Sequence, residues 1–183
     1  MTSSNTESDT VEMPGDLSFA DLQIHPAVLQ AVADVGYESP SPIQAATIPA
    51  MLAGSDVVGL AQTGTGKTAA FAIPILSKID TASRTTQALV LAPTRELALQ
   101  VAEAFSRYGA HLRVNVLPIY GGSPYGPQMA GLKRGAQVVV GTPGRVIDHL
   151  EKRTLDLSHL DYLVLDEADE MLQMGFAEDV ERI

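Results

Sequence analysis

Apolar and polar residues follow two different patterns along this chain. Five short runs rich in Val, Ile and Leu lack the alternation of a half-exposed strand, which is typical of strands buried on both faces. They predict strands at 56–61, 88–92, 114–120, 137–141 and 162–166. The segments between them have apolar residues at helical spacing, and several begin with Pro or a capping residue. They predict helices at 26–35, 43–52, 67–79, 95–108, 127–133 and 144–150.

The alternation of strand and helix indicates an α/β fold in which a parallel sheet carries helices on both faces. In such sheets, ligands bind beyond the carboxyl ends of the strands. The residues directly after each predicted strand are therefore the candidates for functional side chains. The chain contains no internal repeat and no interior low-complexity segment.

The composition is ordinary for a soluble domain. The chain has 183 residues, of which 45% are hydrophobic and 19% charged. No stretch approaches the roughly 18 uninterrupted apolar residues that a membrane span requires, so we expect no membrane association. Cysteine is absent, which excludes a disulfide framework, a thiolate metal site and a thiol nucleophile. The start of the chain lacks the basic and apolar regions of a secretory signal, so we expect a cytoplasmic protein.

The formal net charge of −10 conceals an uneven distribution. Residues 1–22 carry five acids and no base, and residues 161–183 carry eight acids and one base. The Ser- and Thr-rich start is too polar to form a core, so we expect a disordered acidic tail at 1–16. Residues 84–153, in contrast, hold nine bases and four acids, a local charge of +5. The total charge argues against a protein that coats nucleic acid, but the middle of the chain does not.

A glycine-rich segment follows the first predicted strand and opens the next helix. It consists of Ala61, Gln62, Thr63, Gly64, Thr65, Gly66, Lys67 and Thr68. Gly64 and Gly66 let backbone N–H groups curl around the phosphates of a nucleoside triphosphate at a helix N-terminus. Lys67 would contact the β- and γ-phosphates, and the Thr68 hydroxyl would bind Mg²⁺. Ala61 departs from the general pattern, which has glycine there, and the alternative is a glycine-rich turn with an exposed lysine.

Two acidic residues stand where the last predicted strand ends. Asp166 and Glu167 lie 99 and 100 residues after Lys67. A carboxylate here can hold Mg²⁺ through its water shell, and its neighbour can orient and deprotonate an attacking water. We assign Asp166 to the metal and Glu167 to the water. The alternative is that acids simply favour the first turn of the following helix, but the phosphate loop favours catalysis.

With these two motifs the sequence resembles the DEAD-box family of ATP-dependent RNA helicases, which is named for the tetrapeptide at 166–169. The resemblance extends from Phe19 to the last residue and implies a RecA-like P-loop NTPase fold that binds ATP and Mg²⁺. Residues 36–44 resemble the core of the family's adenine-reading Q motif, which spans 17–45 here. By that resemblance Gln44 would hydrogen-bond the adenine edge, because an amide both donates and accepts. Phe19 and Tyr37 would back the base, although alone they are more typical of core aromatics.

Three further segments match the RNA-contact segments of the family's first domain. They are Pro93, Thr94 and Arg95; Gly121 and Gly122; and Thr142, Pro143, Gly144 and Arg145. Each follows a predicted strand, and two of them open helices whose N–H groups can meet phosphates, with an arginine adding charge. The glycine pair lets backbone approach backbone. No row of base-reading aromatics accompanies them, so we expect binding to the RNA sugar–phosphate backbone with little sequence preference.

The remaining residues of the acidic motif carry finer expectations. By the resemblance, Asp169 would couple the nucleotide site to the other domain. Residues 170–176 resemble the bacterial branch associated with cold shock and ribosome assembly, which implies ribosomal or RNA-decay complexes as partners. The four histidines have no metal-ligand spacing and are interpreted as structural or surface residues. They are His25, His111, His149 and His159.

The family's engine has two RecA-like domains, and the resemblance covers only the first. We expect 17–183 to form this domain, C-terminally incomplete, because the chain ends before the family's Ser-Ala-Thr segment; the second domain is absent. By resemblance that segment forms a strand between the phosphate-loop strand and the acidic strand. Its loss would leave unpaired backbone groups at the centre of the sheet.

The leading hypothesis is therefore the ATP-binding portion of an ATP-dependent RNA helicase. A second hypothesis is a non-catalytic module that binds RNA or a partner protein, which the +5 segment favours. A third is a DNA-dependent ATPase, because contacts to the sugar–phosphate backbone do not reveal whether a 2′-hydroxyl is required.

Overall fold

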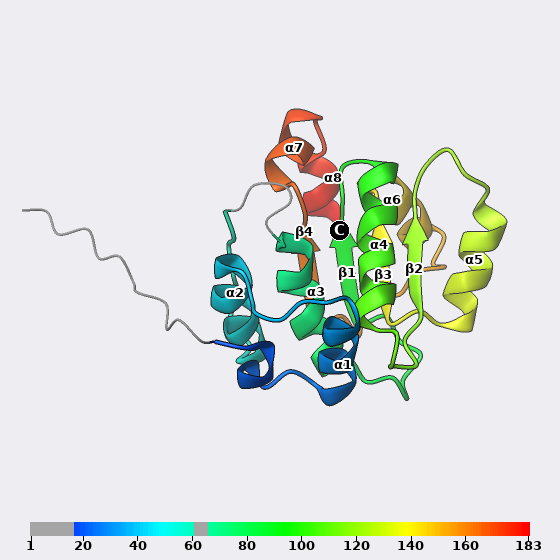
Figure 1. Ribbon diagram of the computed structural model, residues 1–183. Helices are drawn as coiled ribbons and strands as arrows, with labels where there is room; N and C mark the ends of the chain where they lie inside the picture. Colours follow the sequence, from blue (N-terminus) through cyan, green and yellow to red (C-terminus); the bar gives the residue numbers. More distant parts are fainter. Residues whose placement is uncertain (1–16, 61–65) are drawn as a thin grey trace, which may run out of the picture.

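The computed structural model describes residues 17–60 and 66–183, and its ribbon is shown in Figure 1. The predicted tail at 1–16 and residues 61–65 of the predicted phosphate loop lie outside the described residues. Four parallel strands form one sheet in the order β2-β3-β1-β4. The strands are β1 (Ala88–Leu91), β2 (Val116–Ile119), β3 (Val138–Gly141) and β4 (Tyr162–Leu165).

Helices connect and flank the strands. They are η1 (Phe19–Leu22), α1 (Pro26–Asp34), α2 (Pro42–Leu52), α3 (Lys67–Lys78), α4 (Arg95–Tyr108), α5 (Tyr125–Arg134), α6 (Pro143–Glu151), α7 (Ala168–Gln173) and α8 (Ala177–Arg182). The six predicted helices are confirmed, with ends that differ by two residues or fewer. Proline at the first position of α1, α2 and α6 fixes where these helices begin. Within the described residues, no helix is long and apolar enough to span a membrane.

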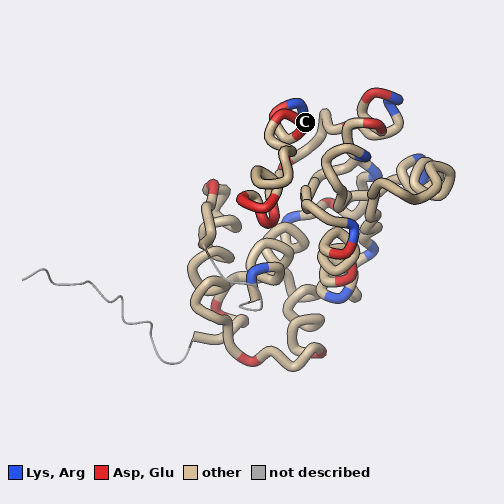
Figure 2. The backbone as a smooth tube through the Cα atoms, turned by 90° about the horizontal axis from the view of Figure 1, so that it is seen from above, with Lys and Arg blue, Asp and Glu red and all other residues tan. Residues whose placement is uncertain are grey.

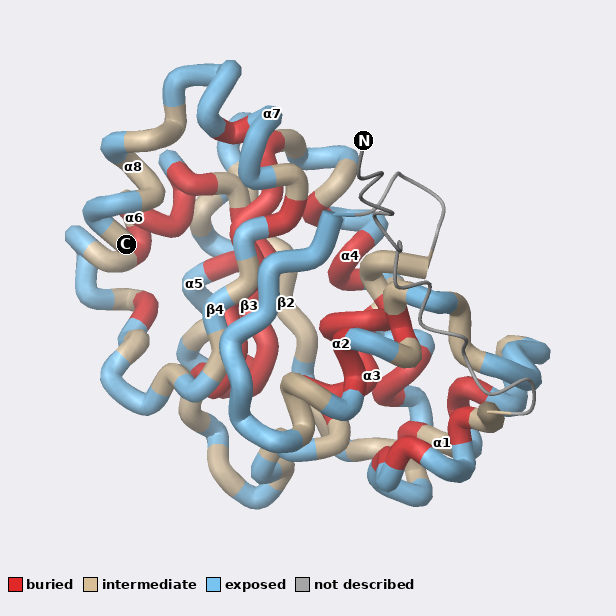
Figure 3. The backbone as a smooth tube through the Cα atoms, turned by 90° about the vertical axis from the view of Figure 1, so that its left-hand side faces the viewer, coloured by how far each residue is buried: buried red, intermediate tan, exposed pale blue. Residues whose placement is uncertain are grey.

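The two faces of the sheet pack against different helices, as the expected α/β fold requires. Along β1, Ala88 and Val90 join a core with side chains from α1, α3 and α4, including Val28, Ile73 and Phe105. Leu89 and Leu91 point the other way, into a core completed by α6 and α7. Strands β1 and β3 are completely buried between these layers. Figure 3 shows the buried segments, drawn in red, toward the interior and exposed segments, drawn in pale blue, on the outside.

The outer strands differ from the prediction that all strands are buried on both faces. Strand β2 is mostly half-buried, and β4 alternates between half-buried and exposed residues. Leu163 and Leu165 stand level with Leu89 and Leu91 on the same face, yet they are 53% and 42% exposed. Among the described strands β4 has one neighbour, β1, and no described helix covers Leu163 and Leu165 on this face.

The prediction of a strand at 56–61 is wrong for the part that the structure describes. Residues 55–60 form no strand and are exposed, with Val58 and Leu60 more than 90% accessible. An apolar run becomes a strand only beside a partner, and none of the described strands pairs with this segment. The segment instead runs in extended form from the end of α2 toward the start of α3 (Figure 1).

The region after β4 also differs from the expectation of one helix. Two short helices, α7 and α8, replace it, and Gly175 separates them with a φ of 83°. A glycine takes this left-handed conformation without the steric cost that a side chain would add. The turn lets Met171 and Val180 both reach the core on the α6 side of the sheet.

The strand register aligns the carboxyl ends of all four strands. Leu91 is level with Gly141 and with Leu165, and Gly141 is level with Ile119. The segments that follow the strands therefore leave the sheet along one edge, at the top of Figure 1. We call this the carboxyl edge, and it is where an α/β sheet binds its ligands.

Gly141 tests the close packing at this edge. A Cβ at Gly141 would lie 2.5 Å from Val146 Cγ2, 2.8 Å from Ile119 Cγ1 and 3.1 Å from the Ile119 carbonyl oxygen. Because the carbonyl belongs to a neighbouring strand, it cannot move aside cheaply. We expect Gly141→Ala to lower the free energy of unfolding by about 1–3 kcal/mol, measured by denaturant titration.

Gly126→Ala is the control for this variant. A Cβ at Gly126 would meet nothing within 4 Å, and the residue is exposed in α5. Alanine is the better helix former by about 1 kcal/mol, so this variant should unfold at the same denaturant concentration or a higher one. Equal losses in both variants would contradict the packing described for Gly141.

Candidate nucleotide site and RNA surface

Helix α3 begins at the carboxyl edge with the last part of the predicted phosphate loop. Gly66 is its N-cap residue and has a φ of 81°, which favours glycine. Lys67 and Thr68 form the first turn, and both are half-buried. The other predicted members, Ala61, Gln62, Thr63, Gly64 and Thr65, lie outside the described residues. The described part therefore offers a helix N-terminus with a lysine and a hydroxyl beside it.

Gln44 ties helix α2 to the start of α3. Its Nε2 donates to the Gly66 carbonyl at 3.2 Å, and its Oε1 accepts from the Ser41 backbone N–H at 3.0 Å. The side chain is 4% exposed, and a Cβ on Gly66 would overlap its amide group. Gln44 therefore lies against the end of the phosphate loop, where it was predicted to read adenine. That role stays a prediction.

Lys67 joins the two chemical motifs of the sequence. Its Nζ donates to Glu167 Oε1 at 2.6 Å and lies 3.2 Å from Asp166 Oδ1. These carboxylates stand directly after β4, whose alignment with β1 is continued by a hydrogen bond from the Asp166 N–H to the Leu91 carbonyl. Residues that are 99 and 100 positions apart in the sequence thus form one charged cluster at the carboxyl edge.

Burial and pairing set the charge of this cluster. Burial raises the pKa of Asp166, and the Lys67 charge only partly offsets this effect. For Lys67, burial alone would lower the pKa, but the hydrogen bond to Glu167 and the charge of Asp166 raise it overall. A carboxyl group whose pKa is raised by folding stabilises the folded state at acidic pH. That stabilisation is lost as the pH rises through the raised pKa. The charged form of Asp166 therefore depends on a nearby cation, and Lys67 supplies it.

The backbone of Glu167 is held in an uncommon conformation. Its φ of 52° and ψ of 51° fall in the left-handed region, which costs a non-glycine residue of order 1 kcal/mol. Glu167 is the N-cap of α7, where the chain turns sharply out of β4. The turn places adjacent carboxyl groups on the same lysine, and strain of this kind is concentrated at functional sites.

The donor set fits a hydrated magnesium ion. Asp166 Oδ1 is buried and accepts no well-aligned hydrogen bond, which leaves an oxygen available to a cation. Thr68 offers a hydroxyl from the first turn of α3. Within residues 17–60 and 66–183, no three His, Cys, Asp or Glu side chains are grouped closely enough to hold a metal by themselves. Mg²⁺ suits such a site, because it binds through one or two carboxylates, water and substrate phosphates.

The two aromatics of the predicted Q motif belong to a row of rings. Phe19 and Tyr37 have centroids 6.5 Å apart, and Tyr37 and Tyr108 are 6.4 Å apart. Phe19 is 3% exposed and part of the core, whereas Tyr37 is 43% exposed. Packing against hydrophobic neighbours explains both positions, and their contact with adenine stays a prediction.

The three predicted RNA segments all lie at the carboxyl edge. Thr94 caps α4 by accepting a hydrogen bond from the Leu97 N–H at 3.2 Å, and Arg95 beside it is exposed. Gly121 and Gly122 follow β2 and are exposed. Thr142, Pro143 and Gly144 open α6 directly after β3. The Arg95 guanidinium lies 4.9 Å from the centre of the Tyr120 ring, so α4 and the glycine pair are neighbours.

Comparison with known proteins agrees with this geometry. A family model described as DEAD/DEAH box helicase matches residues 41–183. The chain belongs to the DEAD/DEAH box helicase family. It is 80% identical over 167 residues to the ATP-dependent RNA helicase DeaD of Mycobacterium tuberculosis (strain CDC 1551 / Oshkosh), covering 91% of this chain and 30% of that protein.

Two further relatives place the domain within this helicase family. The Escherichia coli (strain K12) ATP-dependent RNA helicase DeaD is 59% identical over 169 residues, covering 92% of this chain and 27% of that protein. The crystal structure of a DEAD box protein from the hyperthermophile Methanococcus jannaschii superposes with a TM-score of 0.86 at 42% identity. The match covers 90% of this chain and 45% of that one. The sheet with its flanking helices is thus a DEAD-box RecA-like domain.

Arg145 does not lie where an exposed phosphate contact would. It is only 8% exposed, and its Nη1 donates to the Ser123 carbonyl at 2.9 Å and to Gln128 Oε1 at 3.2 Å. Its guanidinium also stacks 4.0 Å from the centre of the Tyr125 ring. Its predicted contribution of charge to RNA stays a prediction, but the structure shows its hydrogen bonds used inside the protein.

Several neighbours of Arg145 form contacts that the sequence did not predict. Tyr125 donates to Asp148 Oδ2 at 2.6 Å, and Gln128 is 5% exposed. His149 is fully buried, and burial together with the charges of Arg145 and Lys152 lowers its pKa. None of these residues stands in a motif of the helicase family that the sequence displayed. No sequence pattern predicts their roles, because these depend on contacts that form only in the folded structure.

The other three histidines serve local structure. His25 accepts a hydrogen bond from the Ala27 N–H and caps α1, and His111 pairs with Asp34 at 2.6 Å. His159 lies 3.1 Å from the Ser158 hydroxyl.

The charges are segregated in the way the sequence indicates. Residues 17–60, which form η1, α1 and α2, carry no Lys or Arg. Seen from above in Figure 2, the basic residues are spread mainly over the half of the helicase domain that holds α4, α5 and α6. This is the half in which the three predicted RNA segments follow β1, β2 and β3.

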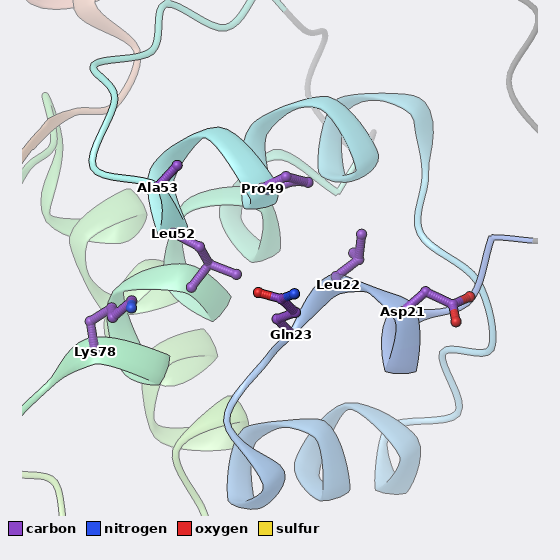
Figure 4. Close-up of a pocket in the computed structure, with 7 residues that line it drawn as sticks. All are labelled: Asp21, Leu22, Gln23, Pro49, Leu52, Ala53 and Lys78. Atoms are coloured by element: carbon purple, nitrogen blue, oxygen red, sulfur yellow. The ribbon is translucent and has the colours of Figure 1, made fainter.

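A separate hollow of about 350 Å³ lies away from this edge and is lined partly by Leu22, Pro49 and Lys78 (Figure 4). Lys78 ends α3, and 12 residues of helix place it about 16 Å from Lys67. The other lining residues come from η1 and the end of α2. The hollow is thus at the opposite end of α3 from the charged cluster and takes no part in it.

The Lys67 cluster can be tested by a double-mutant cycle. Lys67→Met would leave Asp166 buried without its cation, so we expect the free energy of unfolding to fall by about 1–3 kcal/mol. Adding Asp166→Asn should recover most of this loss, because the uncompensated charge is then gone. Denaturant titration of the two single variants and the double variant measures the coupling.

Lys78→Met is the matched control, since it removes a lysine from the exposed end of the same helix. Surface changes of this kind usually stay within about 0.5 kcal/mol. Strictly additive effects of Lys67→Met and Asp166→Asn would show that these two side chains are not energetically coupled.

Proposed function

We propose that this domain binds ATP with Mg²⁺ and is the ATP-binding portion of an ATP-dependent RNA helicase. The observation that carries the proposal is the position of Lys67 Nζ, 2.6 Å from Glu167 and 3.2 Å from Asp166. A phosphate-loop lysine and two carboxylates at one strand end are the parts that nucleotide hydrolysis needs. The chain spans 30% and 27% of the M. tuberculosis and E. coli relatives, and both are named ATP-dependent RNA helicases.

The residues would share the work of hydrolysis as follows. Lys67 would leave the carboxylates for the β- and γ-phosphates, and Asp166 with Thr68 would hold Mg²⁺. The ion would supply the positive charge that Lys67 had given to Asp166. It would also reduce the repulsion between the negative phosphates and the attacking water. Glu167 would orient the attacking water and accept its proton, since its carboxylate is half-exposed at the same point.

RNA would bind along the carboxyl edge through its backbone. The N-termini of α4 and α6 and the exposed glycine pair present N–H groups that suit phosphate and sugar oxygens. Such contacts predict little sequence preference. In a helicase with two such domains, ATP hydrolysis would be coupled to the separation of short duplexes. The resemblance of 170–176 to the cold-shock branch supports ribosomal or RNA-decay complexes as the setting.

Adenine recognition by Gln44 can be tested by calorimetric titration. We expect this chain to bind ATP more tightly than GTP, and Gln44→Ala to remove the difference, because alanine has no amide to read the base edge. Gln100→Ala, an exposed glutamine on α4, is the control and should retain the preference. Equal affinity for both nucleotides in the unaltered chain would refute the adenine assignment.

The role of Glu167 can be tested in a helicase that contains this domain. Glu167→Gln keeps the size of the side chain but removes the base, so ATP should still bind while turnover falls by about 10²–10⁴. Phosphate release under saturating RNA measures the turnover. Retained hydrolysis would contradict the role of general base.

RNA-binding measurements on the isolated chain separate the enzyme from a non-catalytic RNA module. For such a module, RNA affinity would be strong in the isolated chain and indifferent to Lys67→Ala, with no ATP turnover to lose. The position of Lys67 between two carboxylates favours the enzyme, because a module that only binds RNA has no need for this arrangement at the end of a phosphate loop.

A further inference from the structure

Gln128 is the centre of a buried hydrogen-bond network that lies outside the matched motifs. It is on α5 and is 5% exposed. Its Nε2 donates to the Tyr120 carbonyl at 3.1 Å and to the Ser123 hydroxyl at 2.8 Å. Its Oε1 accepts from Arg145 Nη1 at 3.2 Å and lies 3.0 Å from His149 Nε2. An amide has two donor hydrogens and two acceptor lone pairs. Both hydrogens are donated here, Oε1 accepts from Arg145, and His149 Nε2 lies within hydrogen-bond distance of the same oxygen.

The donor side of Gln128 holds the loop that carries the glycine pair. This loop, residues 120–123, connects β2 to α5, and Gln128 contacts both its first and its last residue. Ser123 Oγ also donates to the Tyr120 carbonyl at 3.1 Å, which closes the loop on itself. Gly121 and Gly122 remain exposed, and a Cβ on either would meet nothing within 4 Å. The ends of the loop are therefore held by hydrogen bonds inside the protein, while its two glycines face the solvent.

The acceptor side of Gln128 holds the first turn of α6. Arg145 is the third residue of that helix, and the same Nη1 that donates to Gln128 also donates to the Ser123 carbonyl. Its guanidinium is packed on Tyr125 and is 4.0 Å from Asp148 Oδ2. Arg145 thus joins the segment after β3 to the loop after β2 through two hydrogen bonds inside the protein.

We propose that Gln128 is a positioning residue for the RNA site. It fixes the glycine pair and the N-terminus of α6 in one arrangement, so that both meet the same sugar–phosphate chain without reordering. Arg145 acts in the same way, through hydrogen bonds to the loop. Preorganisation of this kind raises affinity because less conformational entropy is lost on binding. The inference rests on the proposed RNA-binding function of this surface.

Gln137 supplies a matched control, because it is a second buried glutamine with a similar set of partners. It is 2% exposed, its Nε2 donates to the Ser83 carbonyl and its Oε1 accepts from the Asn115 N–H. It stands directly before β3, at the opposite end of the strands from the glycine pair. Loss of its amide costs stability but leaves the carboxyl edge in place.

The test compares Gln128→Met with Gln137→Met by fluorescence anisotropy of a labelled single-stranded RNA. Both variants should unfold at lower denaturant concentration, because each leaves buried polar groups unpaired. Only Gln128→Met should weaken RNA binding, by about tenfold, while Gln137→Met stays within about twofold of the unaltered chain. Equal RNA affinities in the two variants would overturn the inference.

Arg145→Lys separates positioning from direct contact with phosphate. Lysine keeps the charge, but its ammonium cannot bond the loop and Gln128 while lying flat on Tyr125. If Arg145 contacts phosphate directly, the lysine variant should keep its RNA affinity. If Arg145 positions the loop, the RNA affinity of the variant should fall by about tenfold. In Arg145→Met, where the charge is removed, a positioning role leaves the salt dependence unchanged, whereas the loss of a phosphate contact lowers the slope of log affinity against log salt by about 0.7.

These outcomes distinguish the inference from the function on which it rests. An unaltered chain that binds no RNA overturns both. An unaltered chain that binds RNA, with Arg145→Lys retaining full affinity, overturns the inference alone.

Discussion

The alignment of four parallel strand ends is the constraint on which the site depends. Because Leu91, Ile119, Gly141 and Leu165 are level, the chain must leave the sheet four times along one edge. Each exit leads into a loop or a helix N-terminus, which are the parts of a protein that offer unpaired N–H groups. A surface for phosphates therefore follows from the sheet itself, before any side chain is considered. The charged residues refine this surface by adding a cation and two carboxylates at one end of it.

Charge balance explains how that end of the edge remains stable without a ligand. The carboxylates of Asp166 and Glu167 would repel each other, and the Lys67 ammonium between them supplies the compensating positive charge. The arrangement has a consequence for the proposed function. Lys67 would pass from the carboxylates to the triphosphate, and the magnesium ion would take its place beside Asp166. Each charged group would then keep a partner of opposite sign throughout the exchange.

Much of this fold could be predicted from local sequence signals, and the failures have physical causes. Helix α4 matches its predicted range because Thr94 caps it and its apolar spacing is regular. The run at 56–61 was predicted as a strand from hydrophobicity alone, but strand formation also needs a partner. Lys67 and Asp166 were predicted to serve one nucleotide site, and Lys67 Nζ lies 3.2 Å from Asp166 Oδ1, although their roles there stay predictions. Arg145 belongs to a segment that was predicted to contact RNA, but its guanidinium is buried against Tyr125 and Gln128. Gln128 lies in none of the motifs, so no sequence pattern predicts this contact.

The uncovered edge of β4 has a consequence for the behaviour of this chain in solution. Within the described residues, no strand pairs with its outer side, and Leu163 and Leu165 are exposed beside it. An open row of N–H and C=O groups flanked by apolar side chains is a template for any extended backbone. Two copies of the chain can satisfy it by pairing edge to edge. The outer side of β4 is therefore a place in the described fold where a further extended segment can join the sheet.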